Sequence, residues 1–215
     1  MPKKHKKDKK PRRPKINTQI PISKVRKIKL GNPLEPLQNA RQYPILGCWT
    51  MQEWQESGIT PVVIARQQAD DQVLFASYLV DLYCLGVKDV TVNVNLTRKR
   101  FERSLPELCM QEPEAISVEL AHEIVYGALE FALKYGFEPH QDFTRLHADQ
   151  VLDAPDAHPR AHNVQFGQDG KPLYVAGPYD NERKVKRILQ TLESTAGEGN
   201  YNYLIGFGDA DNFDE

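Results

Sequence analysis

The first 30 residues carry more positive charge than a hydrophobic core could accommodate. They hold 13 of the chain's 28 Lys and Arg residues and one of its 29 acidic residues, a net charge of +12. Charges of one sign at this density repel each other, and the run from Lys3 to Lys15 has almost nothing apolar to bury. We therefore predict a disordered basic arm over residues 1–30 and a folded domain farther along the chain.

The rest of the chain has the opposite sign, with 15 basic and 28 acidic side chains. The arm could fold back onto this acidic body, but its charge exceeds what a scattered acidic surface would neutralise. Lysines bind phosphates and release counterions without reading bases. We therefore expect the arm to bind a nucleic acid, RNA or a ribonucleoprotein. The predicted contacts in the arm are Lys3, Lys4, Lys6, Lys7, Lys9, Lys10, Arg12, Arg13 and Lys15.

Two shorter basic groups lie in the body of the chain. One directly follows a predicted strand, and the other lies on the polar side of a predicted helix. Their members, which we also predict to contact nucleic acid, are Arg98, Lys99, Arg100, Arg103, Arg183, Lys184 and Arg187. No RNA-recognition signature accompanies them, so the sequence predicts affinity and salt sensitivity rather than base specificity.

Composition and cysteine usage restrict the class of protein. Hydrophobic residues make up 40% and charged residues 27% of the chain, which is typical of a globular domain. No run approaches the roughly 18 apolar residues of a membrane span, so we expect no membrane association. Three cysteines without a CxxC pair indicate buried thiols in a reducing compartment. The expected location is the cytoplasm, or the nucleus in a eukaryote; the oligomeric state stays open.

The positions of proline and glycine residues along the chain predict the limits of the domain. Residues 31–44 are broken by three prolines and are expected to form an extended linker. A single domain should then cover residues 45–205, followed by an acidic tail over residues 206–215. Alternating or β-branched runs predict its strands, at residues 45–51, 61–65, 73–84 and 90–95. The run at residues 73–84 also fits a buried helix, because its intervening positions are mostly apolar too; we favour the strand.

Two amphipathic segments predict helices. The first runs from Val118 to Tyr135, with Ser117 as its N-cap and Gly136 as its stop, and the second runs from Asn181 to Ser194. Asp180 is the expected cap of the second helix. Asp169-Gly170 predicts a type I′ hairpin between residues 163–167 and 171–176. The resulting fold class is α+β, a small, mostly antiparallel sheet covered by one long and one shorter helix.

A metal-dependent hydrolase, acting for example as a nuclease, is the alternative function. Asp81 interrupts an apolar run, and Asp89 could approach it across a turn at Leu85-Gly86, as in nucleases that hold divalent metal ions. His140, in a segment that also contains His147, His158 and His162, would supply a ligand or base. Asp81 could instead bond backbone amides or Lys88, and the histidines could be solvated. No cofactor is otherwise predicted.

A third function follows if the arm recognises carboxylates rather than phosphates. The protein would then be a scaffold whose basic segment binds an acidic protein partner.

Overall fold

The computed structural model describes residues 34–205. The chain divides into two units, residues 1–31 and 32–215, and every described residue belongs to the second. The predicted basic arm and the predicted acidic tail lie outside the described residues. Between residues 34 and 205, no helix has both the length and the apolar character needed to cross a bilayer.

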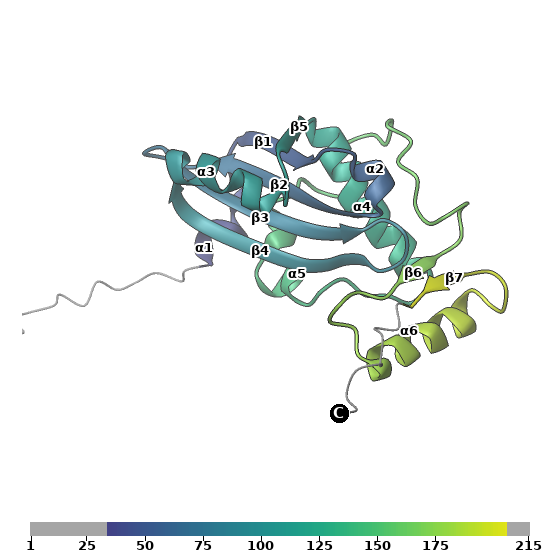
Figure 1. Ribbon diagram of the computed structural model, residues 1–215. Helices are drawn as coiled ribbons and strands as arrows, with labels where there is room; N and C mark the ends of the chain where they lie inside the picture. The colour runs from purple at the N-terminus through teal and green to yellow at the C-terminus, as the bar shows by residue number, and fades with distance from the viewer. Residues whose placement is uncertain (1–33, 206–215) are drawn as a thin grey trace, which may run out of the picture. The chain divides into compact units, whose positions relative to one another are not determined.

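A five-stranded antiparallel sheet forms the centre of this unit (Figure 1). The order across the sheet is β4-β3-β2-β1-β5, so the first four strands are a simple meander and β5 pairs with the outer side of β1. The strands are β1 (Ile45–Met51), β2 (Ile59–Gln67), β3 (Gln72–Asp81), β4 (Gly86–Thr97) and β5 (Pro113–Ile116). The α+β fold class is confirmed, and the four predicted strands are present, although the third ends at Asp81 rather than at residue 84.

Helices lie on both faces of the sheet. In Figure 1, α3 lies in front of the strands and α4 runs behind them. The helical segments are α1 (Glu35–Gln38), η1 (Ala40–Gln42), α2 (Trp54–Ser57), α3 (Arg98–Leu108), α4 (Val118–Lys134), α5 (Asp142–Arg145), η2 (Ala148–Gln150) and α6 (Glu182–Thr195). The long helix covers one face as predicted, whereas the predicted shorter helix, α6, packs at one end of the sheet, and α3, which we did not predict, covers part of the second face.

Side-chain alternation in β2 shows how the sheet separates two hydrophobic clusters. Val62 and Ile64 belong to the larger cluster, with the apolar side of α4, whereas Val63 and Ala65 belong to the cluster beneath α3. Successive side chains of a strand point to opposite faces, so a continuous apolar run indicates a strand covered on both sides. This explains why β2 and β3 show so little polar alternation.

A third cluster joins α6 to the end of the sheet. It combines Tyr135 at the end of α4, Tyr174 of β6 (Leu173–Val175) and the apolar side of α6. β6 pairs in parallel with β7 (Asn202–Leu204), and α6 connects the two strands, so this part is a small βαβ unit.

Each cluster buries one free cysteine. Cys48 lies in the α4 cluster, Cys109 in the α3 cluster and Cys84 in the α6 cluster. Burial disfavours the thiolate, so the pKa of Cys48 rises to about 12 and that of Cys109 to about 11, and the pKa of Cys84 also lies above its ordinary value. The prediction of buried thiols is confirmed.

The ends of α4 form as the sequence predicts. The Ser117 side chain accepts a hydrogen bond of 3.1 Å from the amide of Leu120, and Gly136 adopts a left-handed conformation with φ of 82°. The amide of Phe137 then bonds the carbonyl of Ala132, which satisfies one of the last carbonyls of the helix.

Three local predictions are corrected. The extended linker over residues 31–44 is wrong where α1 and η1 lie, because Leu37 and Ala40 are buried in the core. Asp180 does not cap α6; Asn181 does, with its side chain accepting from the amide of Lys184. The Asp169-Gly170 turn forms, with φ of 52° and 75°, but the flanking ladder is limited to one bridge because β6 pairs with β7 instead.

Gly86 of β4 lies against α4 and provides a test of this packing. Its φ is +66°, and an added Cβ would lie 2.9 Å from the Cβ of Ala132. Gly170 has a similar φ of +75° but open space around it. We expect Gly86→Ala to lower the free energy of unfolding by about 3 kcal/mol and Gly170→Ala by about 1 kcal/mol. Urea titrations measure both; equal losses would mean that the contact with α4 is unimportant.

Candidate functional site

The first basic group lies on α3. Arg98, Lys99, Arg100 and Arg103 are all exposed. Within residues 34–205, Arg98 is the one member of this group with an ion-pair partner, Glu102, at 3.1 Å. Three of the four side chains lie in the first turn, where the helix dipole is already positive. They therefore reinforce the positive potential at this end of the helix rather than balance it, which favours contact with an anion.

The second basic group lies on the outer side of α6. Arg183, Lys186 and Arg187 are exposed, whereas Lys184 lies 2.5 Å from Asp180 and is partly neutralised by it. The group thus contains Lys186 in addition to the three residues predicted from the sequence.

A groove of about 460 Å³ separates α6 from the beginning of β4. Its basic side chains are Lys88, His140, Lys184 and Arg187, and Glu138 contributes one carboxylate. Its apolar floor comes from Leu85, Val87 and Ile188. Because the basic side chains outnumber the single carboxylate, the groove extends the positive surface of α6 toward the sheet.

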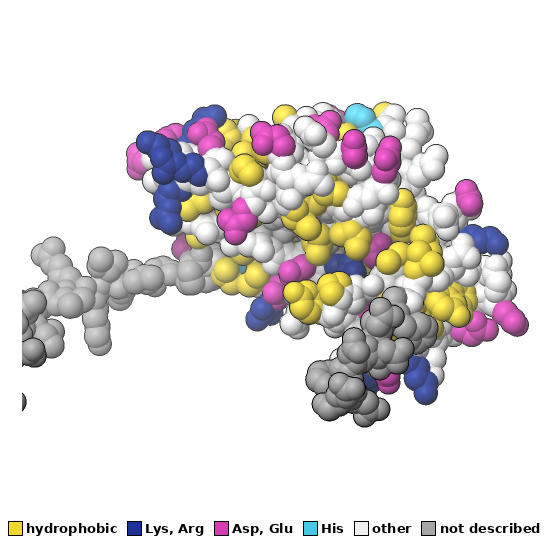
Figure 2. Space-filling model, in the orientation of Figure 1, with side chains coloured by type: hydrophobic (Ala, Val, Ile, Leu, Met, Phe, Trp, Pro, Cys, Tyr) yellow, Lys and Arg dark blue, Asp and Glu magenta, His cyan; other side chains and the backbone are white. Residues whose placement is uncertain are grey.

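The two basic groups lie at opposite ends of β4, which is an edge strand. At about 3.3 Å per residue, the stretch from Lys88 to Arg98 spans roughly 33 Å. Figure 2 shows dark blue side chains over α3 on the left and others around α6 at the lower right. The two groups therefore do not meet in one cleft, and a single ligand in contact with both must be extended.

Asp81 serves the turn that follows β3. It is buried, and its Oδ1 accepts hydrogen bonds from the amides of Tyr83 at 2.9 Å and Cys84 at 3.0 Å. Burial raises the pKa of Asp81, while Lys88 and the backbone amides act in the opposite direction. One carboxylate oxygen is thus committed to local backbone structure, which is the alternative that we gave for this residue.

Asp89 and His140, by contrast, come close together. His140 Nδ1 lies 4.0 Å from Asp89 Oδ1 and 3.9 Å from Asp142 Oδ2. Asp89 is largely exposed, and its backbone partner across the ladder is Leu79 rather than Asp81. Among residues 34–205, no group of three or more His, Cys, Asp or Glu side chains is arranged to hold a metal ion.

The four histidines of the predicted loop have separate surroundings. His147 Nε2 lies 3.2 Å from the Gln38 amide, and His158 Nε2 lies 2.8 Å from Asp153 Oδ2. The His162 side chain is exposed, and its backbone amide bonds Glu123. His158 is half-buried rather than solvated, and the reason is a polar network that the sequence did not reveal.

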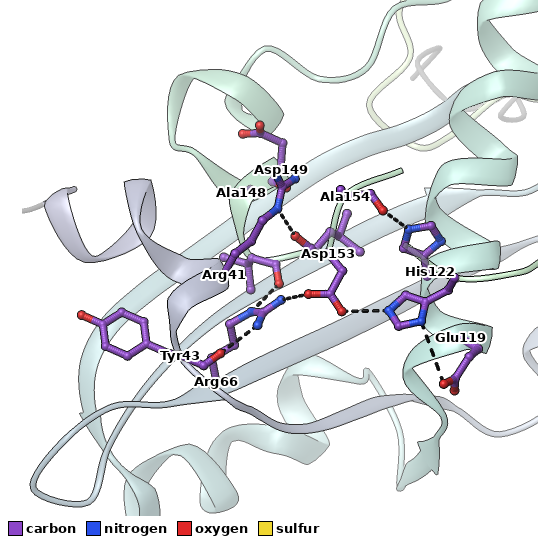
Figure 3. A network of polar contacts seen from close by, with 12 residues as sticks. Arg41, Tyr43, Arg66, Glu119, His122, Ala148, Asp149, Asp153 and Ala154 are labelled. Atoms are coloured by element: carbon purple, nitrogen blue, oxygen red, sulfur yellow. Dashed lines mark hydrogen bonds and ion pairs between the residues drawn. The ribbon is translucent and has the colours of Figure 1, made fainter. Parts of the chain in front are cut away.

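Arg66 lies at the centre of this network (Figure 3). Its side chain is 3% exposed and makes three kinds of contact: Nε donates to the carbonyl of Val151, Nη1 to the carbonyl of Tyr43, and Nη2 to Asp153 Oδ1 at 2.6 Å. The other oxygen of Asp153 holds His158. The guanidinium therefore joins the end of β2 to the segment before β1 and to the segment after η2.

Asp153 is ionised in this arrangement. Burial raises its pKa, but hydrogen bonds from His158 and Arg66 outweigh burial, so its pKa lies below the ordinary value. On the far side of His158, Nδ1 lies 4.0 Å from Glu119 of α4. An imidazole between carboxylates is oriented firmly, and in this position it fastens the loop to the helix.

His122 of α4 lies beside this chain of contacts. Its Nε2 is 2.8 Å from the carbonyl of Ala154 and must donate, because a carbonyl oxygen only accepts. The remaining nitrogen, Nδ1, is then unprotonated, and it is the one buried side-chain polar atom within residues 34–205 that lacks a hydrogen-bond partner. Burial is the largest cause that lowers the pKa of His122, and His158 and Arg160 act in the same direction.

Sequence reasoning missed Arg66, His122 and Asp153. A basic residue at the end of the apolar run of β2 was the available signal for Arg66, by the same argument that singled out Asp81. No comparable signal identifies Asp153, because its partners lie 87 and five residues away.

The buried ion pair can be tested against an exposed one on the same loop. Asp153→Ala leaves the Arg66 guanidinium buried without its carboxylate, and we expect the free energy of unfolding to fall by about 3 kcal/mol. Glu130→Ala breaks the exposed ion pair between Glu130 and Arg160 and should cost no more than about 1 kcal/mol. Denaturant unfolding of both variants measures the difference, and similar losses would contradict a central role for Arg66.

The unpartnered nitrogen of His122 predicts a pH dependence. Because its pKa in the folded protein lies below the ordinary 6.5, the unfolded chain takes up a proton first as the pH falls, so stability is lost below about pH 6.5. His122→Gln keeps a donor for Ala154 and removes the titration. Between about pH 7.5 and pH 5.5, the wild type should lose more stability than the variant, by at most about 1.4 kcal/mol per pH unit. Parallel pH profiles would contradict this assignment.

No family model matches the chain, and comparison with curated proteins and with solved structures gave no significant match.

Proposed function

We propose that this protein binds RNA, alone or in a ribonucleoprotein, through its basic N-terminal arm and the two basic groups of the folded unit. The observation that carries the proposal is the segregation of charge. Nearly half of the Lys and Arg residues, 13 of 28, lie in the first 30 positions with a single acid among them. A polyanion is the partner that such a segment binds most strongly, because each neutralised phosphate releases counterions.

Two basic groups on the described part of the chain, on α3 and on α6, support contact with such a partner. Exposed cations gather on α3 and on α6, while the body as a whole has an acidic balance. An acidic surface repels phosphates, so a bound strand would contact the basic groups and avoid the rest. This arrangement favours binding through the backbone of the nucleic acid, with little dependence on sequence.

The salt dependence of binding tests the role of the arm. In the full chain, the six lysines from Lys3 to Lys10 are changed to Gln in one variant and to Arg in a matched control. For a labelled single-stranded RNA, the Gln variant should bind more weakly, and the slope of log K against log salt should shrink by up to about 4, at about 0.7 per phosphate. The Arg control keeps the charge and should keep the slope.

Two outcomes would contradict the proposal. If the Gln variant and the wild type bind RNA with the same affinity and slope, the arm does not contact the phosphates. If partners captured by the protein from a nuclease-treated extract are unchanged and purified RNA does not bind, the segment recognises an acidic protein instead.

A further inference from the structure

A cleft of about 560 Å³ lies between α2, the turn after β3 and the segment that precedes β6. This volume is within the range of sites for small ligands. Of the two aromatic residues in its lining, Tyr83 is half-buried and offers ring surface, whereas Trp54 is 5% exposed; Leu82 and Leu120 supply aliphatic contacts. Among the elements that line it, α2 lies at the right-hand end of the sheet in Figure 1.

The backbone around the cleft is held in place by contacts with the rest of the fold. Glu123 of α4 is 4% exposed, and its two oxygens accept from the amides of His162 at 2.9 Å and Val164 at 3.0 Å. The amide of Gly167 bonds the carbonyl of Leu82 at 2.9 Å, and Trp54 is 5% exposed. The walls are therefore built without a ligand.

The polar side chains on these walls are unused. The cleft is lined by four exposed side-chain amides, those of Gln55, Asn163, Gln165 and Gln168. Within the described range of the chain, none of these side-chain amides has a hydrogen-bond partner. The hydrogen bonds between Gln168 and Lys171 use the backbone groups of both residues. Each amide offers both a donor and an acceptor. The cleft thus joins a fixed frame with free hydrogen-bonding groups.

The charge of the lining limits the ligand. Among the described residues that form the cleft, none is Lys or Arg, and Asp169 is the only carboxylate. A phosphate or carboxylate would meet no Lys or Arg among these residues, and His162 is the one basic side chain of the lining. Asn and Gln amides are the side chains that pair with the edges of nucleobases, and aromatic rings are the surfaces on which bases stack. We propose that this cleft binds a nucleobase, as a free nucleoside or as an unstacked base of an RNA strand.

The position of the cleft connects it to the basic side of α6. The turn after β3 contributes Tyr83 to the cleft and Leu85 to the groove that contains Lys184 and Arg187. An RNA strand with a base in the cleft would have to follow this turn for its neighbouring phosphates to reach these cations. For the RNA-bound base, this inference rests on the function proposed above, whereas binding of a free nucleoside does not.

The two tryptophans of the chain make the site directly observable. Trp54 lines the cleft, whereas Trp49 packs against Phe101, with ring centroids 5.5 Å apart, in the cluster beneath α3. In full-length protein labelled with ¹⁵N-tryptophan, the two indole signals are assigned with Trp49→Phe. Adenosine, guanosine, cytidine, uridine, glucose and a single-stranded RNA are then titrated separately.

At least one nucleoside should shift the Trp54 signal and leave Trp49 unchanged, with a Kd on the order of 1 mM for one stacked and hydrogen-bonded base. Removing two of the free amides, in Gln165→Ala/Gln168→Ala, should weaken nucleoside binding about tenfold. Gln141→Ala, which removes another exposed glutamine that lies outside the cleft, should leave it unchanged.

The outcomes separate the two proposals. A shift with nucleosides but no binding of RNA would keep the cleft site and overturn the RNA-binding function. Salt-dependent RNA binding without any change at Trp54, with either RNA or nucleosides, would keep that function and overturn the cleft site. A response to glucose alone, or equal responses of both tryptophans, would also overturn the cleft site.

Discussion

The architecture around α4 depends on one buried cation. The Arg66 side chain is almost completely buried. A buried charge is tolerated only if each of its N–H donors finds a hydrogen-bond acceptor. Its acceptors come from three parts of the chain: the carbonyl before β1, the carbonyl after η2, and the carboxylate of Asp153. Because these acceptors lie on separate segments, the loop after η2 is fixed relative to the sheet, and His158 and His122 are fixed with it. The segment that borders the cleft follows next in the sequence and is held to the same helix by Glu123.

The elements that the sequence predicts are those whose cause is local. Ser117 and Gly136 set the limits of α4, and apolar runs such as that of β2 indicate strands covered on both faces. The turn at Asp169-Gly170 is local as well, and it forms, but the pairing of the strand beyond it depends on β7, which lies far along the chain. Helix α3 escapes prediction because it is short and polar, contains Pro106 and buries only Phe101 and Leu105.

Much less of the candidate site follows from sequence alone. Basic groups are visible as runs of Lys and Arg. The exposure of the group on α6 agrees with the polar face expected there, whereas the helix that carries the other group, α3, was not expected. The network and the cleft require knowledge of which distant residues meet: Arg66 with Asp153, and Glu123 with the backbone of a segment about 40 residues later. Asp81 and Asp89 show that closeness in the sequence can also suggest a site that the fold does not form. Their sequence spacing suggested one site, but the register of β3 and β4 pairs Asp81 with Gly86 and Asp89 with Leu79.

In this proposal, the basic groups and the cleft recognise different parts of the RNA: the basic groups contact its phosphates, and the cleft contacts a base. The basic groups would attract phosphates over a distance of about a Debye length, roughly 8 Å at physiological ionic strength, without distinguishing one base from another. The cleft would act only at contact and on uncharged, planar groups. Such a division would allow weak discrimination between bases to be added to an affinity that is mainly electrostatic.

The distribution of the cysteines gives the fold a set of internal reporters. Each of the three thiols is sealed in a different hydrophobic cluster, and each has a pKa raised by burial, so an alkylating reagent cannot react at an appreciable rate until the surrounding cluster opens. The order in which Cys48, Cys84 and Cys109 become modified would therefore reveal whether the βαβ unit, the α3 layer and the α4 layer open as one cooperative body or come apart in succession.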